Sequence, residues 1–586
     1  MELLDNLINV LNSYLTPVLV VMLLGAGIYL TLRLGFVQFR RFWHGVLVTS
    51  GKYDDPDEPG DVTHFQALNT ALSATVGIGN IAGVALAIHI GGPGAVFWMW
   101  VTALLGMATK YSEVTLAQHY RVEVKPEVGK RVWAGTVAGG PMYYIEQGLG
   151  KHWKPIAIFF AFMLMMTSLM TGNAIQANTV ATEFNDMFGI ATWITGLVTA
   201  SIIGVVIIGG IKRIGRVTSL LVPVMAAIYI LAALVVLALH LGDVAPTFAS
   251  IFTEAFDPSA GVAGTGIGIF LTTMTYGVQR GLFSNEAGQG SAPIAHSAAK
   301  TDEPVSEGSV ALLEPFIDTI VVCTMTAMVI VITGSHEARV DTSLDLSNPN
   351  ITYVVGSDEE GYERVSRPAQ IDFREGFPAD DEDEIFLGYH NIGVSQLFTD
   401  PAQTEPFTGT LFPVLETAET EEGVTLDELY GPAVRTSSPL TSLGFQRGLE
   451  PIGLGDWGRY MVLISVFLFA ISTSISWSYY GDRCANYLFG VKSIMPFKGV
   501  FLLFHFIGAV LAVTTIWNLG DVALALVTIP NVLALVLLSP TLSRVTKSYF
   551  DRKPWLENEQ VQSKIREEEK KERDERRGEG GGKDDA

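Results

Sequence analysis

The chain has 586 residues, of which 49% are hydrophobic and only 17% are charged, and its mean hydropathy is +0.34. This composition indicates an integral membrane protein rather than a set of soluble domains. The net charge of −22 excludes a basic nucleic-acid-binding protein, because such a protein needs an excess of Lys and Arg to offset phosphate charge.

Apolar runs along the chain predict about eleven transmembrane helices, since a helix needs about 20 apolar residues to cross the hydrocarbon core. The first run has no small-residue cleavage site after it, so we expect a membrane anchor, with a cleaved signal as the alternative. The predicted helices are 14–33, 66–90, 96–117, 155–178, 188–210, 217–240, 261–281, 311–334, 459–480, 496–516 and 520–541.

Along the chain, loops that are rich in Lys and Arg alternate with loops that contain neither residue. With the N-terminus outside the cell, the short outward loops 1–13, 91–95, 181–187, 241–260 and 517–519 contain no Lys or Arg. Cytoplasmic loops of membrane proteins hold an excess of these residues. We therefore predict a multi-pass protein of the cell membrane with its N-terminus outside and its C-terminus in the cytoplasm.

A strongly acidic segment, residues 335–456, separates the eighth and ninth predicted helices. It holds 24 Asp and Glu against six Arg and no Lys. A disordered acidic loop is one interpretation, but short strand-like runs at 351–355, 370–373 and 384–389 favour a small β-rich domain. The expected organisation is transmembrane helices in 1–334, an extracellular insertion in 335–456, transmembrane helices in 457–541 and a charged cytoplasmic tail in 542–586.

The predicted helix 66–90 contains an unusual segment at mid-span. Residues Ser73 to Asn80 read Ser-Ala-Thr-Val-Gly-Ile-Gly-Asn, which combines two glycines with three polar side chains. Glycine destabilises a helix interior by about 1 kcal/mol relative to alanine. The segment indicates either close helix packing through small residues or an unwound stretch whose backbone groups bind a substrate and a cation.

A second interruption is expected at the end of the predicted helix 261–281, where the sequence from Arg280 to Gly290 becomes rich in glycine and polar residues. This helix runs opposite to helix 66–90. The pattern predicts an all-α polytopic membrane fold of two inverted five-helix repeats, 66–240 and 261–541, with helix 14–33 as an accessory. In such folds the substrate site lies at mid-membrane between the broken helices.

Several motifs together resemble the alanine or glycine:cation symporter family; they are Ala71–Val84, Gly91–Trp100, Gly139–Tyr144, Gly281–Pro293 and Ser472–Trp477. The core from Val76 to Asn80 is also similar to the first unwound helix of neurotransmitter:sodium symporters, which have the leucine-transporter-type fold. The resemblance implies sodium-driven uptake of alanine or glycine, with Na⁺ as the coupling ion and no organic cofactor. Ile78 departs from the Thr expected in some members, and the insertion is longer than usual.

The resemblance also implies a substrate site. Backbone N–H groups at an unwound helix can bind the carboxylate of an amino acid, as a helix N-terminus binds anions. Gln176 resembles a pocket glutamine of the family, and Phe283 and Trp477 resemble apolar walls that limit substrate size, although such aromatics also serve simple packing. The expected substrate-binding residues are Thr75, Gly77, Ile78, Gly79, Asn80, Gln176, Phe283, Thr473 and Trp477.

A sodium site is expected beside the substrate, because Na⁺ prefers several hard oxygen ligands. The resemblance implies that Ser73, Val76, Ser472 and Thr473 are these ligands. The alternative is that the serine hydroxyls bond to the backbone of their own helix. The titratable residues Lys110, Glu113, Glu286 and Asp318 are expected to stabilise the fold or to act in gating.

Other functions fit the sequence less well. A channel needs a continuous polar lining, whereas the polar residues concentrate at two helix breaks. An enzyme is not indicated, because the sequence contains no HExxH or GxSxG motif. A receptor that uses the insertion does not require broken helices, and a proton-coupled amino-acid transporter remains the main alternative to sodium coupling. The expected partners are a small neutral amino acid, sodium and lipid, but no nucleic acid.

Overall fold

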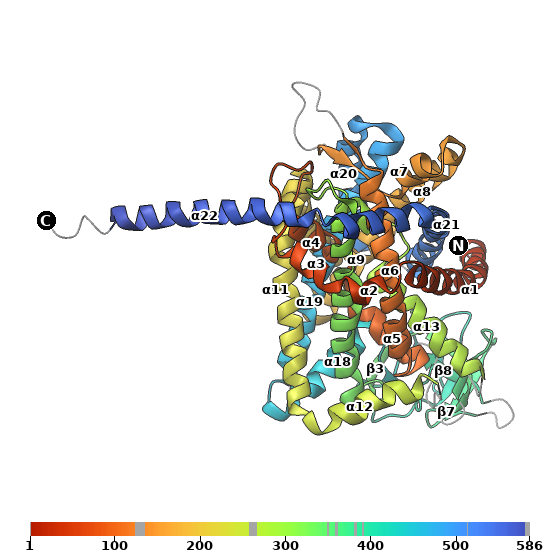
Figure 1. The fold of residues 1–586 in the computed structure, drawn as a ribbon. Coiled ribbons are helices and arrows are strands. Elements are labelled where there is room, and N and C mark those ends of the chain that lie inside the picture. The colour runs from red at the N-terminus through yellow and green to blue at the C-terminus, as the bar shows by residue number, and fades with distance from the viewer. Residues whose placement is uncertain are drawn as a thin grey trace.

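The computed structural model describes residues 2–123, 135–256, 267–348, 351–357, 361–379, 384–389, 392–511 and 514–580. Helices make up most of the molecule, and small antiparallel sheets lie at one end of the helical bundle (Figure 1). In this part of the chain seven helices are long and apolar enough to cross a membrane, or eight if a bent pair counts as one span. The prediction of a mostly helical, multi-span membrane protein is confirmed.

The first twelve α-helices are α1 (Glu2–Arg33), α2 (Val37–Arg40), α3 (Phe42–Thr49), α4 (His64–Thr75), α5 (Ala82–Gly91), α6 (Ala95–His119), α7 (Pro141–Gly148), α8 (Lys154–Leu169), α9 (Ile175–Phe188), α10 (Thr192–Ile207), α11 (Gly210–Leu239) and α12 (Leu241–Glu254). The later ones are α13 (Ile267–Asn285), α14 (Ala292–His296), α15 (Pro304–Ala311), α16 (Leu313–Pro315), α17 (Thr324–Ile332), α18 (Ser437–Leu449), α19 (Gly455–Phe489), α20 (Ile494–Val510), α21 (Thr514–Arg552) and α22 (Trp555–Gly580). Two π-helical stretches, Met170–Ala174 and Phe316–Cys323, lie before α9 and α17. Residues 261–266 and 512–513 of two predicted helices lie outside the described residues.

The predicted interruption in helix 66–90 is confirmed. Helix α4 begins with a capping box, in which the Thr63 side chain accepts from the Gln66 backbone and the Gln66 side chain accepts from the Thr63 backbone. It ends at Thr75, Gly77 is extended, and a 3₁₀ turn over Ile78–Asn80 leads to α5. The two halves of this helix pair are bent by 59°.

The second interruption begins at Glu286, within the predicted stretch from Arg280 to Gly290. Helix α13 continues through Gly281 to Asn285, so the predicted helix end at Gly281 is wrong. A β-carbon on Gly281 would lie 3.1 Å from the Met99 α-carbon of α6, so this glycine allows close helix packing rather than unwinding. The chain leaves the helix at Glu286, which has a φ of +54°, and continues to α14.

The acidic insertion contains folded antiparallel sheets, as the β-rich interpretation predicted. Strands β3 and β13 pair along their length, with Asp345 opposite Glu428, and carry the chain away from the bundle and back. The remaining sheets have the strand orders β12-β11-β10-β6-β7 and β5-β4-β8-β9. The insertion has its own small apolar core, which includes Leu344, Phe373 and Phe407.

The strands have these bounds: β1 (Val122–Glu123), β2 (Val137–Ala138), β3 (Arg339–Asp345), β4 (Ile351–Ser357), β5 (Gly361–Arg364), β6 (Ile371–Arg374), β7 (Phe377–Pro378), β8 (Phe386–Tyr389), β9 (Ile392–Gly393), β10 (Gly409–Phe412), β11 (Thr417–Thr420), β12 (Thr425–Leu426) and β13 (Glu428–Val434). Strands β1 and β2 form a separate pair outside the insertion.

Helix α18 lies inside the segment predicted as insertion, and the sequence did not predict it. It packs against α17, α19 and α5. The Thr441 hydroxyl donates to the carbonyl of Ile81, directly beside the broken helix, at 3.0 Å. The C-terminal part of residues 335–456 is therefore part of the helical body.

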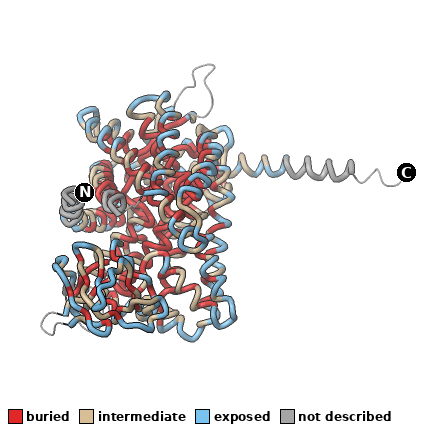
Figure 2. Tube along the Cα trace, turned by 180° about the vertical axis from the view of Figure 1, so that it is seen from behind, coloured by how far each residue is buried: buried red, intermediate tan, exposed pale blue. Residues whose placement is uncertain are grey.

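Buried residues fill the centre of the bundle, while exposed residues lie on its periphery (Figure 2). Large apolar side chains are exposed on peripheral helices, among them Phe159, Leu197, Val205, Leu220 and Leu231. A soluble protein seldom exposes so many large apolar side chains, whereas lipid is a favourable neighbour for them.

Candidate functional site

A small cavity of about 20 Å³ lies where the break between α4 and α5 meets α13 and α19. Its lining residues are Ala74, Thr75, Gly77, Ile78, Gly79, Thr171, Gln176, Phe283, Glu286, Gln289, Thr473, Trp477 and Leu524. Eight of the nine residues predicted to bind substrate belong to this lining. A single water needs roughly 10–15 Å³ by the same measure, so the cavity is narrow in this conformation.

Two glycines of the break allow α19 and α13 to approach the backbone. A β-carbon on Gly77 would lie 2.6 Å from the Thr473 hydroxyl oxygen, and one on Gly79 would lie 3.2 Å from the Phe283 ring. The first distance is too short for any real side chain. The glycines predicted at mid-span therefore allow α13 and α19 to pack closely against the backbone of the break.

Trp477 is held in place from two sides. A β-carbon on Gly172, in the π-helical stretch before α9, would lie only 2.2 Å from the indole ring. On the other side, the indole N–H donates to the Glu286 carboxylate at 3.1 Å, and Ser291 donates to the same carboxylate. Sequence reasoning did not place Glu286 in the cavity lining and did not predict the contact with Gly172. The acidic residue within the glycine-rich run after α13 was the available signal for Glu286.

Four lining residues carry a polar atom that is buried and has no hydrogen-bond partner within the described part of the chain. These atoms are Thr171 Oγ1, Gln176 Oε1, Gln289 Oε1 and Thr473 Oγ1. A buried polar group without a partner is costly, and nearly all such groups in native proteins are satisfied. Their concentration around one cavity indicates a site for a polar ligand.

The structure brings together the residues predicted to bind sodium. The Ser73 hydroxyl of α4 donates to the Ser472 carbonyl of α19 at 2.6 Å, and Ser472 donates to the Phe469 carbonyl at 2.9 Å. Val76 is buried directly after α4, and Thr473 faces Gly77. The serine hydroxyls thus bond to backbone in this conformation, while the Thr473 hydroxyl has no partner among the described residues.

Asn80 lies behind the cavity rather than in its lining. Its side-chain oxygen accepts from the Gly77 N–H at 2.8 Å, and its amide donates to Asp318 at 2.6 Å and to Ser284 at 3.0 Å. The carboxylate of Asp318 also accepts from Ser284. Asn80 therefore fixes the unwound backbone to α13 and to the π-helical stretch before α17.

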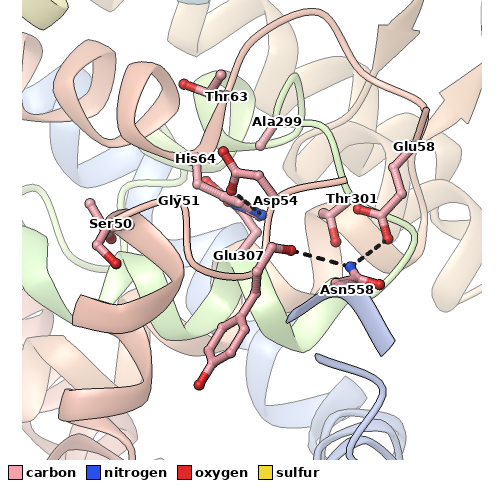
Figure 3. A network of polar contacts seen from close by, with 12 residues as sticks. Ser50, Gly51, Asp54, Glu58, Thr63, His64, Ala299, Thr301, Glu307 and Asn558 are labelled. Atoms are coloured by element: carbon pink, nitrogen blue, oxygen red, sulfur yellow. Dashed lines mark hydrogen bonds and ion pairs between the residues drawn. The ribbon is translucent and has the colours of Figure 1, made fainter. Parts of the chain in front are cut away.

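A chain of buried charged groups lies below the break. Lys110 pairs with Glu314 at 2.8 Å, and His296 lies between Glu314 and Glu307 at 3.6 and 2.5 Å. Glu307 also contacts His64 at the start of α4 (Figure 3). These pairs connect α6, α16, α14, α15 and α4.

The C-terminal helix α22 binds the loop that precedes α4. Asn558 donates to Glu58 at 3.1 Å and to the Tyr53 carbonyl at 3.3 Å, close to the His64–Glu307 contact (Figure 3). Gln562 donates to the Asp54 carbonyl at 2.6 Å. Burial raises the pKa of both Asp54 and Glu58 above the ordinary carboxyl value.

Comparison with known proteins identifies the family of this chain. A profile of the Sodium:alanine symporter family matches residues 1–361 and 424–564. The sodium/alanine symporter AgcS of Methanococcus maripaludis is 38% identical over 93% of this chain and 97% of its own length. The chain belongs to the sodium:alanine symporter family. It is therefore a member of a transporter family rather than an enzyme, and the predicted family is confirmed.

Two further relatives fit this assignment. A transporter of Haemophilus influenzae is 34% identical over 94% of this chain and 96% of its own length. The amino-acid carrier protein AlsT of Bacillus subtilis is 39% identical over 56% of this chain and 67% of its own length. The family match leaves out residues 565–586 at the C-terminus and residues 362–423, a part of the insertion that includes strands β6 to β11. The helices that surround the cavity all lie in the matched part.

Proposed function

We propose that this protein carries a small neutral amino acid, alanine or glycine, into the cell together with sodium by alternating access. The proposed membrane body has eleven spans with the N-terminus outside and the C-terminus in the cytoplasm. Two inverted five-helix repeats, 66–240 and 261–541, contain the breaks after Thr75 and Asn285. The family match supports sodium as the coupling ion.

The observation that carries this proposal is the set of unpartnered polar atoms beside an unwound helix. The N–H groups of Ile78 and Gly79 lie at the start of the 3₁₀ turn. The first N–H groups of such a turn have no carbonyl acceptor within the turn itself. They are suited to bind the substrate carboxylate. The N–H of Gly77 already donates to Asn80, so its role is to hold this geometry.

The substrate ammonium needs oxygen acceptors. The side-chain oxygens of Gln176 and Gln289 are buried acceptors in the cavity lining without a partner in the described structure. The Glu286 carboxylate adds negative charge on the same side. The methyl group of alanine would then lie against Phe283 and Trp477, and the small cavity disfavours larger side chains.

Sodium is proposed to bind between α4 and α19, at Ser73, Val76, Ser472 and Thr473. Thr473 would contact both the ion and the substrate site, because it lines the cavity and faces Gly77. Binding of the ion would draw α19 toward the break and order the backbone that receives the carboxylate. This shared residue gives a physical reason for coupling.

Uptake into proteoliposomes tests the function. Labelled alanine should accumulate with an inward sodium gradient and should not accumulate with potassium. The matched variant Thr473→Ala should weaken the dependence on sodium more than Thr441→Ala, which lies outside the cavity. Accumulation driven equally by a proton gradient in the absence of sodium would favour proton coupling and contradict the proposal.

A further inference from the structure

A second cavity, of about 230 Å³, lies between the C-terminal end of α1, helix α2 and the last turns of α21. It is far larger than the cavity at the helix break. Four of its lining residues are cationic and one is acidic: Arg33, Arg40, Arg41, Lys547 and Asp551. No sodium or amino-acid chemistry calls for such a set, so the cavity has no role in the proposed transport site.

Within the described residues, the carboxylate of Asp551 offsets only one of the four positive charges that line this cavity. In the described structure no ion pair joins Arg33, Arg40 or Lys547 to a carboxylate, and all three are exposed. Arg40 donates to the Gly35 carbonyl at 3.3 Å. Four cations and one acid give a local charge of +3. An anion that enters the cavity would offset this positive charge.

Arg41 is the cation of this group that packs on an aromatic ring. Its guanidinium lies 3.5 Å from the centre of the Phe550 ring, which connects the end of α2 with α21. Burial, and after it repulsion from Arg40, lowers the pKa of Arg41. A planar guanidinium held in this way can present a fork of N–H donors to a phosphate.

Exposed aromatic residues lie beside the cavity. Phe36, Phe39 and Trp43 have exposed fractions of 49%, 63% and 74%, although they are large and apolar. Arg33, which lines the cavity, is also the last residue of an apolar membrane span. Aromatic rings next to Arg and Lys at the end of a span are typical of the level of lipid headgroups.

We propose that this cavity binds a phosphate group, supplied by the headgroup of an anionic phospholipid. The four cations contact the phosphate, the aromatic residues of α2 and α3 lie in the headgroup layer, and the acyl chains follow the apolar surface of α1. Basic pockets between membrane helices bind such headgroups by the same charge and donor chemistry. The lipid would join α1 to α21 at the membrane surface.

The test compares the purified full-length protein with the variant Arg33→Gln/Arg40→Gln/Lys547→Gln. Arg41 is kept because its packing on Phe550 could affect folding. The matched control removes three exposed cations elsewhere: Lys151→Gln/Arg216→Gln/Lys492→Gln. Phosphatidylglycerol, phosphatidylcholine or inorganic phosphate is added, and native mass spectrometry and the thermal midpoint report binding.

Wild-type and control protein should retain phosphatidylglycerol in preference to phosphatidylcholine and gain thermal stability from it. Each cation near an anionic headgroup contributes about fivefold in affinity, so the triple variant should lose about 100-fold. If inorganic phosphate protects the wild type as well as phosphatidylglycerol does, the phosphate site stands but a lipid source is wrong. Equal lipid retention by the triple variant and the control would overturn the proposal.

Discussion

Gly77 and Thr473 face each other across the helix break, and a β-carbon on the glycine would lie only 2.6 Å from the threonine hydroxyl. Gly77 belongs to the unwound segment after α4, and Thr473 belongs to α19. Gly77→Ala should therefore push α19 away and lower kcat/KM for alanine uptake by more than about tenfold, because small displacements of a binding site have large kinetic effects.

Gly83 provides a matched control for this variant. It is buried on α5, but a β-carbon there would have no heavy atom within 4 Å. Gly83→Ala should keep near wild-type uptake. The double variant Gly77→Ala/Thr473→Ala should regain substrate binding but not the full dependence on sodium. If Gly77→Ala alone transports normally, the close approach has no role in transport.

Trp477 should control the size of the substrate. Its ring is 2% exposed and lines the cavity, so Trp477→Ala should admit larger neutral amino acids. Alanine itself should bind less tightly, by about 1–3 kcal/mol, as expected when apolar contacts in a pocket are lost. Competition of labelled alanine uptake by a series of amino acids measures both effects. Trp457→Ala, on the same helix but 66% exposed, should leave the competition series unchanged.

The sheets of the insertion should be dispensable for transport. Asp345 and Glu428 are directly opposite each other in the β3–β13 ladder, so an Asn-Gly turn can replace residues 346–427 as a two-residue hairpin loop. Sodium-driven uptake should remain within about twofold of wild type, since no cavity residue is lost. Loss of transport in a correctly inserted variant would assign a gating role to the sheets.

A deletion that extends into α18 should destabilise the protein, unlike removal of the sheets alone. Replacing 345–445 would remove most of this helix, together with the hydrogen bond from Thr441 to the Ile81 carbonyl. Thr441→Ala tests that bond alone and should destabilise the protein by about 1 kcal/mol, because a buried carbonyl loses its partner. The thermal midpoint of the purified protein reports this effect.

His44 should make the contact between α3 and the C-terminal segment sensitive to pH. Its ring lies 4.7 Å from that of Trp555, and its Nε2 is 2.8 Å from the Tyr549 hydroxyl. Burial, and then repulsion from Arg41, lowers the pKa of His44 from 6.5 to about 4. The neutral ring is favoured in the folded protein, so its stabilisation is present above pH 6.5 and is lost as pH falls toward 4.

Between pH 7 and pH 5 this loss should reach about 2 kcal/mol for local opening of the contact. Hydrogen exchange of residues 42–53 and 549–562, corrected for the intrinsic pH dependence, measures it. His44→Phe keeps an aromatic ring but cannot titrate, so its protection should not change with pH. The same pH dependence in wild type and variant would exclude His44 as the cause.

Local sequence patterns predicted the features that depend on residues adjacent in the chain. Charge-free runs predicted a multi-span helical protein, although in the described residues only seven or eight of the eleven predicted spans meet the length and hydropathy of a membrane helix. Glycine with polar residues at mid-span predicted the break after Thr75. The end of the helix before the second break was placed too early, at Gly281 instead of Asn285, because a glycine has the same local sequence context whether it unwinds a helix or packs closely against Met99. Only the position of α6 distinguishes the two.

Contacts between distant residues could not be predicted in this way. Trp477 meets Gly172 and Glu286, which lie far away in the chain, and no periodic pattern connects them. Asn80 was expected at the substrate, but its amide meets Asp318 and its oxygen meets Gly77. Helix α18 was missed because the acidic strand-like runs before it set the interpretation of the whole segment.

Because α22 is long, small movements at its start become large displacements at its far end. Its contacts with the loop before α4 come from the first half of the helix, and the rest extends sideways from the bundle (Figure 1). The helix has 26 residues, which at about 1.5 Å per residue makes a rod of roughly 39 Å. A tilt of only about 10° at the loop would move the far end by about 7 Å. A fluorescent label near the end of α22 would thus amplify small movements of α4 into a signal that energy-transfer measurements can follow during turnover.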